Sequence, residues 1–200
     1  RRAPIYDKAG DGHYNLISAL HKSVRGSDPD AALYWLCRML SAGEDPRYLA
    51  RRIVRMAVED IGLAEPAAVT QTLAARDVYE QLGSPEGELA LAQAVVYLAL
   101  APKSNAVYSA YKRASEAARK TGSRPPPKHI LNAPTRLMKD EGYAAGYLYD
   151  HDEEDGFSGQ NYFPDGMKRG VYYTPRERGF ERELAKRLDW FVKKRAEKGG

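Results

Sequence analysis

The chain has 200 residues, of which 43% are hydrophobic and 29% are charged. These values are typical of one globular domain, alone or with a small appendage, and they exclude a wholly disordered chain. The net charge of +4 is unevenly placed, because residues 168–198 hold eleven Lys/Arg against five Asp/Glu. This basic segment is either a solvated helix face or a surface for nucleic acid or an acidic partner.

The first 120 residues read as a series of helices whose starts share one signature. A capping or acidic residue is followed by proline, whose missing N–H costs nothing at the first helical position. The signature occurs at Asp28-Pro29, Asp45-Pro46, Glu65-Pro66 and Ser84-Pro85.

Apolar spacing predicts six helices in this region. Short links between them favour antiparallel neighbours, and a helical solenoid is the alternative, although no residue pattern repeats between the units. The single cysteine, Cys37, is expected to be buried in the second helix. The inward faces, in chain order, are Tyr14/Ile17/His21/Val24, Leu33/Leu36/Cys37/Leu40, Leu49/Ile53/Met56/Ala57, Val69/Leu73/Leu82, Leu89/Gln93/Val96/Leu100 and Ser104/Tyr108/Tyr111/Ser115/Ala118.

The proline-rich stretch 121–127 breaks this pattern. A short helix over 135–141 follows, and then a stretch rich in tyrosine, glycine and acid with too few aliphatic residues for a second core. We therefore predict an all-α protein: a helical bundle over 1–120, a Pro/Tyr-rich irregular layer over 121–179 packed on it, and a basic amphipathic helix over 180–200.

Sequence motifs that would indicate catalysis are absent. The chain holds no GxxxxGK[ST], GxGxxG, GxSxG, HExxH or EF-hand loop, and no histidine has metal-ligand spacing. The acidic run 150–155 is interpreted as a solvated loop, the neighbouring Glu59 and Asp60 as structural or interface residues that do not face one another, and His21 as a core or interface histidine. We predict no catalytic, cofactor or metal site.

Two residue sets are candidates for binding. Arg47, Arg51 and Arg55 recur every four residues and share one helix face. Such a stripe meets phosphates, or it pairs with Glu44, Glu59 or another subunit. The candidate contacts for DNA or a partner are Lys22, Arg25, Arg47, Arg51, Arg52 and Arg55, and the candidate subunit-interface residues, which core packing would also explain, are Tyr34, Trp35, Tyr97, Tyr108 and Tyr111.

Several stretches together resemble one family. They include Tyr6-Asp7-Lys8, the run from His13 to Trp35, Glu59-Asp60-Ile61-Gly62-Leu63-Ala64, Ala101-Pro102-Lys103-Ser104-Asn105-Ala106-Val107-Tyr108, Leu131-Asn132-Ala133-Pro134-Thr135 and Tyr162-Phe163-Pro164. In this order they resemble the segment that follows the AAA+ module in the RarA/MgsA family of ATPases, whose eukaryotic relatives interact with the Werner helicase. The resemblance covers residues 6–180.

The resemblance implies a clamp-loader-like C-terminal collar that holds a homo-oligomer, a tetramer in relatives, together. The parent is expected to be a DNA-dependent ATPase of replication-fork maintenance, recombination and repair, with single-strand DNA-binding protein as a partner. ATP and Mg would bind in an upstream module, so this fragment is not expected to be an enzyme. A nucleic-acid-binding helical module is the alternative function. We expect a cytoplasmic, nucleoid-associated location with no membrane partner.

Overall fold

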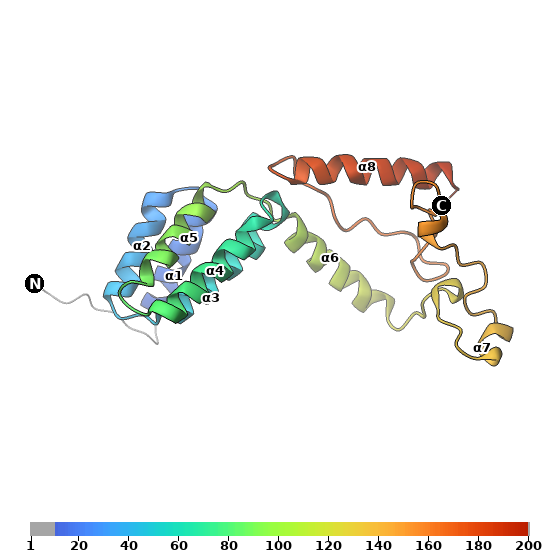
Figure 1. Ribbon diagram of the computed structural model, residues 1–200, viewed down its shortest axis with the longest axis horizontal. Helices are drawn as coiled ribbons and strands as arrows, with labels where there is room; N and C mark the ends of the chain where they lie inside the picture. Colours follow the sequence, from blue (N-terminus) through green and yellow to red (C-terminus); the bar gives the residue numbers. More distant parts are fainter. Residues whose placement is uncertain (1–10, 200) are drawn as a thin grey trace, which may run out of the picture. The chain divides into compact units, whose positions relative to one another are not determined.

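The computed structural model describes residues 11–199, which contain eight α-helices and no β-strand (Figure 1). The all-α prediction is therefore confirmed for these residues. In chain order the helices are α1 (Asp11–Arg25), α2 (Pro29–Ser41), α3 (Pro46–Met56), α4 (Ala67–Leu82), α5 (Glu88–Leu100), α6 (Ala106–Thr121), α7 (Arg136–Asp140) and α8 (Glu181–Glu197). A π-helical turn, Ala57–Ile61, continues α3, and 3-10 turns occupy Gly62–Ala64, Lys128–Ile130 and Asp150–Asp152.

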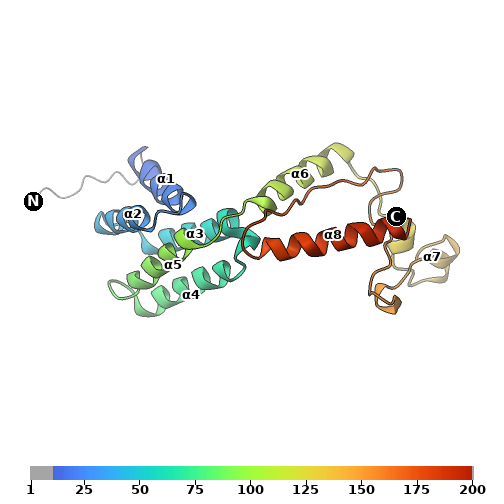
Figure 2. The ribbon, with the colours of Figure 1, turned by 90° about the horizontal axis from the view of Figure 1, so that it is seen from above.

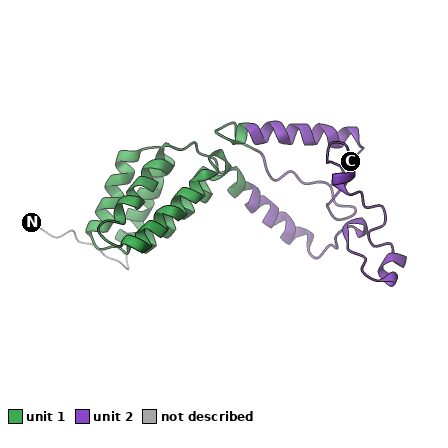
Figure 3. Ribbon diagram, viewed as in Figure 1, with its two compact units in different colours: residues 1–109, 175–182 green, residues 110–174, 183–200 purple. Residues whose placement is uncertain are grey.

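The chain divides into two compact units (Figure 3). Unit 1 comprises residues 1–109 and 175–182, and unit 2 comprises residues 110–174 and 183–200. The domain bounds expected from sequence, after residues 120 and 179, stay a prediction, as does the packing of the irregular layer on the bundle. None of the described helices has the length and apolar character needed to cross a membrane.

Unit 1 is a five-helix bundle in which α5 contacts each of the first four helices (Figure 2). Its core is made of fully buried aliphatic side chains, among them Leu20, Leu36, Ile53, Leu91 and Leu98. Burial of one such side chain contributes roughly 1.5–3 kcal/mol. Because many such side chains form one buried cluster, unit 1 has a core of its own.

Two of the four proline-marked helix starts have the predicted geometry. The Asp28 carboxylate accepts from the Ala31 amide before α2, and the Asp45 carboxylate accepts from the Arg47 amide before α3. The other two differ. Pro66 is itself the N-cap of α4, and Pro85 lies in a turn three residues before α5. Neither Glu65 nor Ser84 caps a helix with its side chain.

Two predicted inward positions in the first two helices are wrong. Tyr14 is 72% exposed, because α1 buries Ile17, Leu20 and Val24 instead. Cys37 is exposed, because α2 buries Ala32, Leu36 and Met39, and adjacent helical positions diverge by about 100°.

The inward face of α5 was also assigned wrongly. Leu89 and Leu100 are exposed, and the buried face is formed by Leu91, Ala94, Val95, Leu98 and Ala99. Nearly every side chain of this helix is apolar, so apolar spacing does not distinguish its faces.

The segment 175–182 is tied into unit 1 by specific contacts. Phe180 donates its amide to the Ala64 carbonyl over 2.8 Å. The buried Glu181 carboxylate accepts from the Ser104 hydroxyl and the Arg176 amide, both at 2.7 Å. Gly179 has φ +52°, and a Cβ there would lie 2.1 Å from the Ala64 oxygen, so no other residue fits without a shift.

In unit 2, two aromatic side chains of α8 pack on the ring of Phe157. Phe157 is buried, and its ring centroid lies 5.1 Å from that of Phe191 and 6.2 Å from that of Trp190 on α8. The Arg195 guanidinium lies over the same ring. This cluster holds the irregular 150–160 segment against the end of α8.

Candidate functional site

The most connected polar cluster of unit 1 joins α1 to the π-helical turn. His21 and Arg25 lie one turn apart on α1, and both contact the buried carboxylate of Asp60. The His21 Nε2–Asp60 Oδ2 distance is 2.5 Å, and Arg25 Nε donates to Asp60 Oδ1 over 2.7 Å. His21 is thus a hydrogen-bonded buried residue, as predicted from its place in the first helix.

The π-helical turn changes how Glu59 and Asp60 point. Although the two residues are adjacent, Arg25 reaches both, because its Nη2 lies 3.6 Å from Glu59 Oε1. Glu59 also accepts from Arg55 Nε over 3.0 Å. The expectation that the two carboxylates do not face one another is therefore wrong, since single π-helical turns alter side-chain direction and are frequent at functional sites.

The cluster favours ionised Asp60. Burial of the Asp60 carboxyl would by itself raise its pKa, but hydrogen bonds from His21 and Arg25 outweigh burial and hold the pKa below its usual value. The same hydrogen bond raises the pKa of the Arg25 guanidinium, against the opposing effect of burial. The pair is charged at neutral pH.

His21, Glu59 and Asp60 also have the composition of a metal site. Each offers one ligand atom, and these atoms lie within 4.8 Å of one another. However, the carboxylate oxygens already accept from the guanidinium groups of Arg25 and Arg55, and a cation would have to displace both. The donor set therefore fits an ion-pair cluster and does not fit a metal centre.

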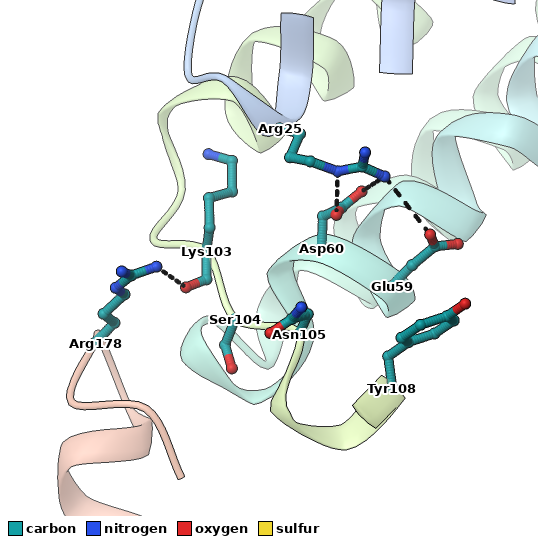
Figure 4. Close-up of a pocket in the computed structure, with 8 residues that line it drawn as sticks. All are labelled: Arg25, Glu59, Asp60, Lys103, Ser104, Asn105, Tyr108 and Arg178. Carbon is teal, nitrogen blue, oxygen red and sulfur yellow. Dashed lines mark hydrogen bonds and ion pairs between the residues drawn. The ribbon is translucent and has the colours of Figure 1, made fainter. Parts of the chain in front are cut away.

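Beside this cluster lies a polar pocket of about 440 Å³ (Figure 4). Lys103 and Arg178 line it opposite Glu59, with Tyr108 beneath. Lys103 Nζ donates to the carbonyls of Ala99 and Ala101 at the end of α5, and burial lowers the pKa of its ammonium group. The Lys103 charge thus stabilises a helix C-terminus.

The predicted basic residues separate into two groups. Lys22, Arg25, Arg52 and Arg55 surround one depression between α1 and α3. Arg47 and Arg51 line another, where Arg47 donates to Glu80 on α4. Three of the cations therefore already have carboxylate partners, and the role of the set in binding DNA or a partner stays a prediction.

Two family models match the chain. The family model "MgsA AAA+ ATPase C terminal" matches residues 26–192, and "AAA C-terminal domain" matches residues 1–25. The chain belongs to the RarA/MgsA family of AAA+ ATPases. It corresponds to the C-terminal part of that family, which agrees with the absence of a phosphate-binding GxxxxGK[ST] motif from its sequence.

Named relatives support the assignment to the RarA/MgsA family. The chain is 54% identical over 189 residues to replication-associated recombination protein A of Coxiella burnetii and 50% identical over 192 residues to that of Escherichia coli. These alignments cover 94% and 96% of the chain but 43% of each relative. ATPase WRNIP1 of Dictyostelium discoideum is 47% identical over 174 residues, which is 86% of the chain and 20% of the relative.

The candidate interface residues of this RarA/MgsA domain are mostly on its surface. Tyr34, Tyr108 and Tyr111 are exposed, whereas Trp35 and Tyr97 are half-buried. Tyr34 and Trp35 pack edge to face, and Arg38 lies over the Trp35 ring. Their role in subunit contacts stays a prediction.

The acidic run of the domain, residues 150–155, has defined partners in unit 2. Asp150 accepts from the Ser158 amide, the Ser158 hydroxyl and the Tyr162 hydroxyl, and these bonds lower its pKa. Glu153 pairs with Lys198, and Asp155 pairs with Lys194. The carboxylates thus engage different partners rather than converging on a cation, and part of the basic tail pairs with them.

Sequence reasoning missed two features of this RarA/MgsA domain. Lys103 and Arg178 were not expected at a pocket, and only the placement of Lys103 just after Pro102, at a helix end, would have indicated a role. A groove between α4 and α5 was also missed. It has a volume of about 320 Å³ and includes Val78, Leu82, Leu89 and Tyr97.

Proposed function

We propose that this chain is the self-association domain of a RarA/MgsA-type ATPase, in which copies of the chain meet through the groove between α4 and α5. The parent protein would act in replication-associated recombination, as the names of the bacterial relatives indicate. ATP and Mg would be bound by the parent's ATPase module, so we expect this chain alone to hydrolyse no ATP.

One observation carries the proposal: the groove exposes large aliphatic side chains on adjacent helices. Leu89 is 74% exposed and Leu82 is 55% exposed, and Val78 and Tyr97 continue the same apolar lining. A monomer gains nothing from placing these residues in water, whereas an aromatic and aliphatic patch rimmed by Gln and Glu side chains is typical of a protein interface.

The occupant that we propose is a second copy of the chain. Closed homo-oligomers are the commonest assemblies, and the exposed faces of α4 and α5 offer ridges and grooves that suit further helix packing. The family resemblance implies self-association through this domain, with a tetramer as the expected assembly.

Light scattering after gel filtration tests the proposal at tens of micromolar. We expect a mass near four times the chain mass of 22.3 kDa. Leu89→Asp should shift the particle towards 22.3 kDa, because a charge buried at an apolar interface costs at least about 2 kcal/mol. Leu137→Asp is the matched control, since Leu137 is 68% exposed and lies outside the groove.

Two results would contradict the proposal. The first is a wild-type chain that stays at 22.3 kDa throughout this concentration range. The second is a Leu89→Asp variant that assembles as well as Leu137→Asp, which would place the interface elsewhere.

A further inference from the structure

The depression between α1 and α3 is small and strongly polar. Its volume is about 160 Å³, and its lining includes Ser18, Lys22 and Arg25 from α1 and Arg52 and Arg55 from α3. We name it the Arg52 pocket. It shares no lining residue with the groove between α4 and α5.

Positive charge exceeds negative charge at the Arg52 pocket. Its lining holds four cationic side chains and one carboxylate, Glu59, while Asp60 lies behind Arg25. Arg25 and Arg55 pair with these acids. Among residues 11–199, no ion pair joins Lys22 or Arg52 to a carboxylate. Two positive charges are therefore left for an external anion.

Arg52 is the residue that most needs such an anion. Its Nε is buried and has no hydrogen-bond partner among the described residues. A buried donor without a partner costs about 1–3 kcal/mol, and more when it belongs to a charged group. If the Arg52 side chain turned this buried donor towards the pocket, an entering anion would accept the hydrogen bond and would also meet the exposed ammonium group of Lys22.

We propose that the Arg52 pocket binds a backbone phosphate of single-stranded nucleic acid. The guanidinium fork matches two oxygens of a phosphate, and arginine is the residue most used for that purpose. Tyr14 also lines the pocket and is 72% exposed, so its ring offers a surface on which the adjacent unpaired base stacks. Basic side chains beside an exposed aromatic ring are the usual elements of a single-strand site.

The surroundings favour nucleic acid over an acidic peptide. On the same helix the exposed Arg51 lies one turn before Arg55, at a rise of about 6 Å, and lines the neighbouring depression, so basic side chains continue along the α3 axis outside the pocket. Apart from Ile17 and the ring of Tyr14, the lining residues are polar or charged, so the pocket offers little to the apolar side chains that anchor most peptides.

Fluorescence anisotropy with a labelled 20-nucleotide oligo-dT tests the site on the whole chain. We expect Arg52→Gln to weaken binding roughly tenfold, because a hydrogen bond to a charged group is lost. The slope of log Kobs against log salt should become shallower by about 0.7, the value for one phosphate contact on a single strand. Tyr14→Ala should weaken binding by a similar factor, since stacking is worth roughly 1–3 kcal/mol per base.

The control variant is Arg38→Gln, which removes the same charge from the exposed surface of α2. It should change affinity by less than about twofold. Arg52→Gln removes a buried Nε that has no partner, so its thermal midpoint without DNA should be no lower than that of the wild type. If it nevertheless unfolds, Lys22→Gln, on an exposed residue, provides the same test.

The proposal is overturned if Arg52→Gln and Arg38→Gln bind the oligonucleotide equally well, or if the wild-type chain does not bind it at 50 mM salt. It is also overturned if a poly-glutamate peptide binds in an Arg52-dependent manner and the oligonucleotide does not. Inorganic phosphate is then added as a competitor of oligo-dT. If it releases oligo-dT from the wild-type chain at equal concentrations of phosphate groups, the pocket is a site for free phosphate. Particle mass, measured on the same samples, reports separately on self-association.

Discussion

Replacing Asp60 by asparagine removes the charge at the centre of the α1–π-turn cluster and leaves the side-chain volume almost unchanged. The carboxylate accepts from Arg25 over 2.7 Å and contacts His21 over 2.5 Å, and it is 6% exposed. In the variant one oxygen still accepts from Arg25, but the amide nitrogen faces His21. We expect the free energy of unfolding of unit 1 to fall.

The expected loss in the free energy of unfolding follows from how deeply Arg25 and Asp60 are each buried. Breaking a fully buried ion pair costs about 3–5 kcal/mol, because one charge is left without a partner. Arg25 is 49% exposed, so water solvates it after the substitution and the cost is smaller. The bond to buried His21 is the larger loss. We therefore expect Asp60→Asn to destabilise the chain by about 2 kcal/mol at pH 7.

Urea denaturation followed by circular dichroism measures this difference, and its pH dependence provides a second test. The folded-state pKa of Asp60 is lowered, so its contribution is fully present above the ordinary carboxyl pKa of about 3.9 and is lost as the pH falls through the folded value. The groups facing it are His21, Arg25 and Glu59. The difference in the free energy of unfolding between wild type and Asp60→Asn should therefore shrink below about pH 4.

Asp77→Asn is the matched control, because Asp77 is 60% exposed and, within residues 11–199, its one ion pair is with its neighbour Arg76. It should change stability by less than about 0.5 kcal/mol. The reasoning is refuted if Asp60→Asn costs no more than Asp77→Asn, or if the Asp60→Asn gap is the same at pH 3 and pH 7.

Other contacts give further predictions. Gly179→Ala should expose the 175–182 segment to limited proteolysis, because its Cβ would clash with the Ala64 carbonyl; an unchanged digestion rate would contradict this. Phe157→Ala should destabilise the contact between the 150–160 segment and α8 by about 3 kcal/mol, seen as faster amide exchange, whereas the exposed Leu148→Ala should not. Cys37 should react with Ellman's reagent in the folded chain at a rate near that of a free thiol, and protection until unfolding would show that it is buried.

Helix positions in this protein follow largely from local signals. Asp28 and Asp45 cap their helices as expected, because a side-chain oxygen followed by proline fixes a helix start without help from the rest of the fold. The face of α3 was also predictable, since its arginines and its apolar residues lie on opposite sides. Ser84 does not cap a helix, because Ser84 and Pro85 lie in the turn before α5. The prediction was wrong because a Ser-Pro pair in a turn looks the same in sequence as one at a helix start.

The candidate sites were less predictable. The sequence identified the cations of the Arg52 pocket, but their separation from Arg47, their pairing with Glu59 and the buried Nε of Arg52 depend on how α1 meets α3. The groove beside Leu89 was missed because the residue was placed on the inward face of α5.

By itself the sequence determined that the chain is helical, where the two Asp-capped helices begin, and which family it resembles, because capping and motif order are local properties. Only the tertiary structure decided which face of the uniformly apolar α5 is buried, and that Ser104 meets Glu181 across 77 positions of the chain. Such choices depend on the packing of several helices at once. The residues that pack together in these contacts lie far apart in the chain, so no short stretch of sequence contains all of them.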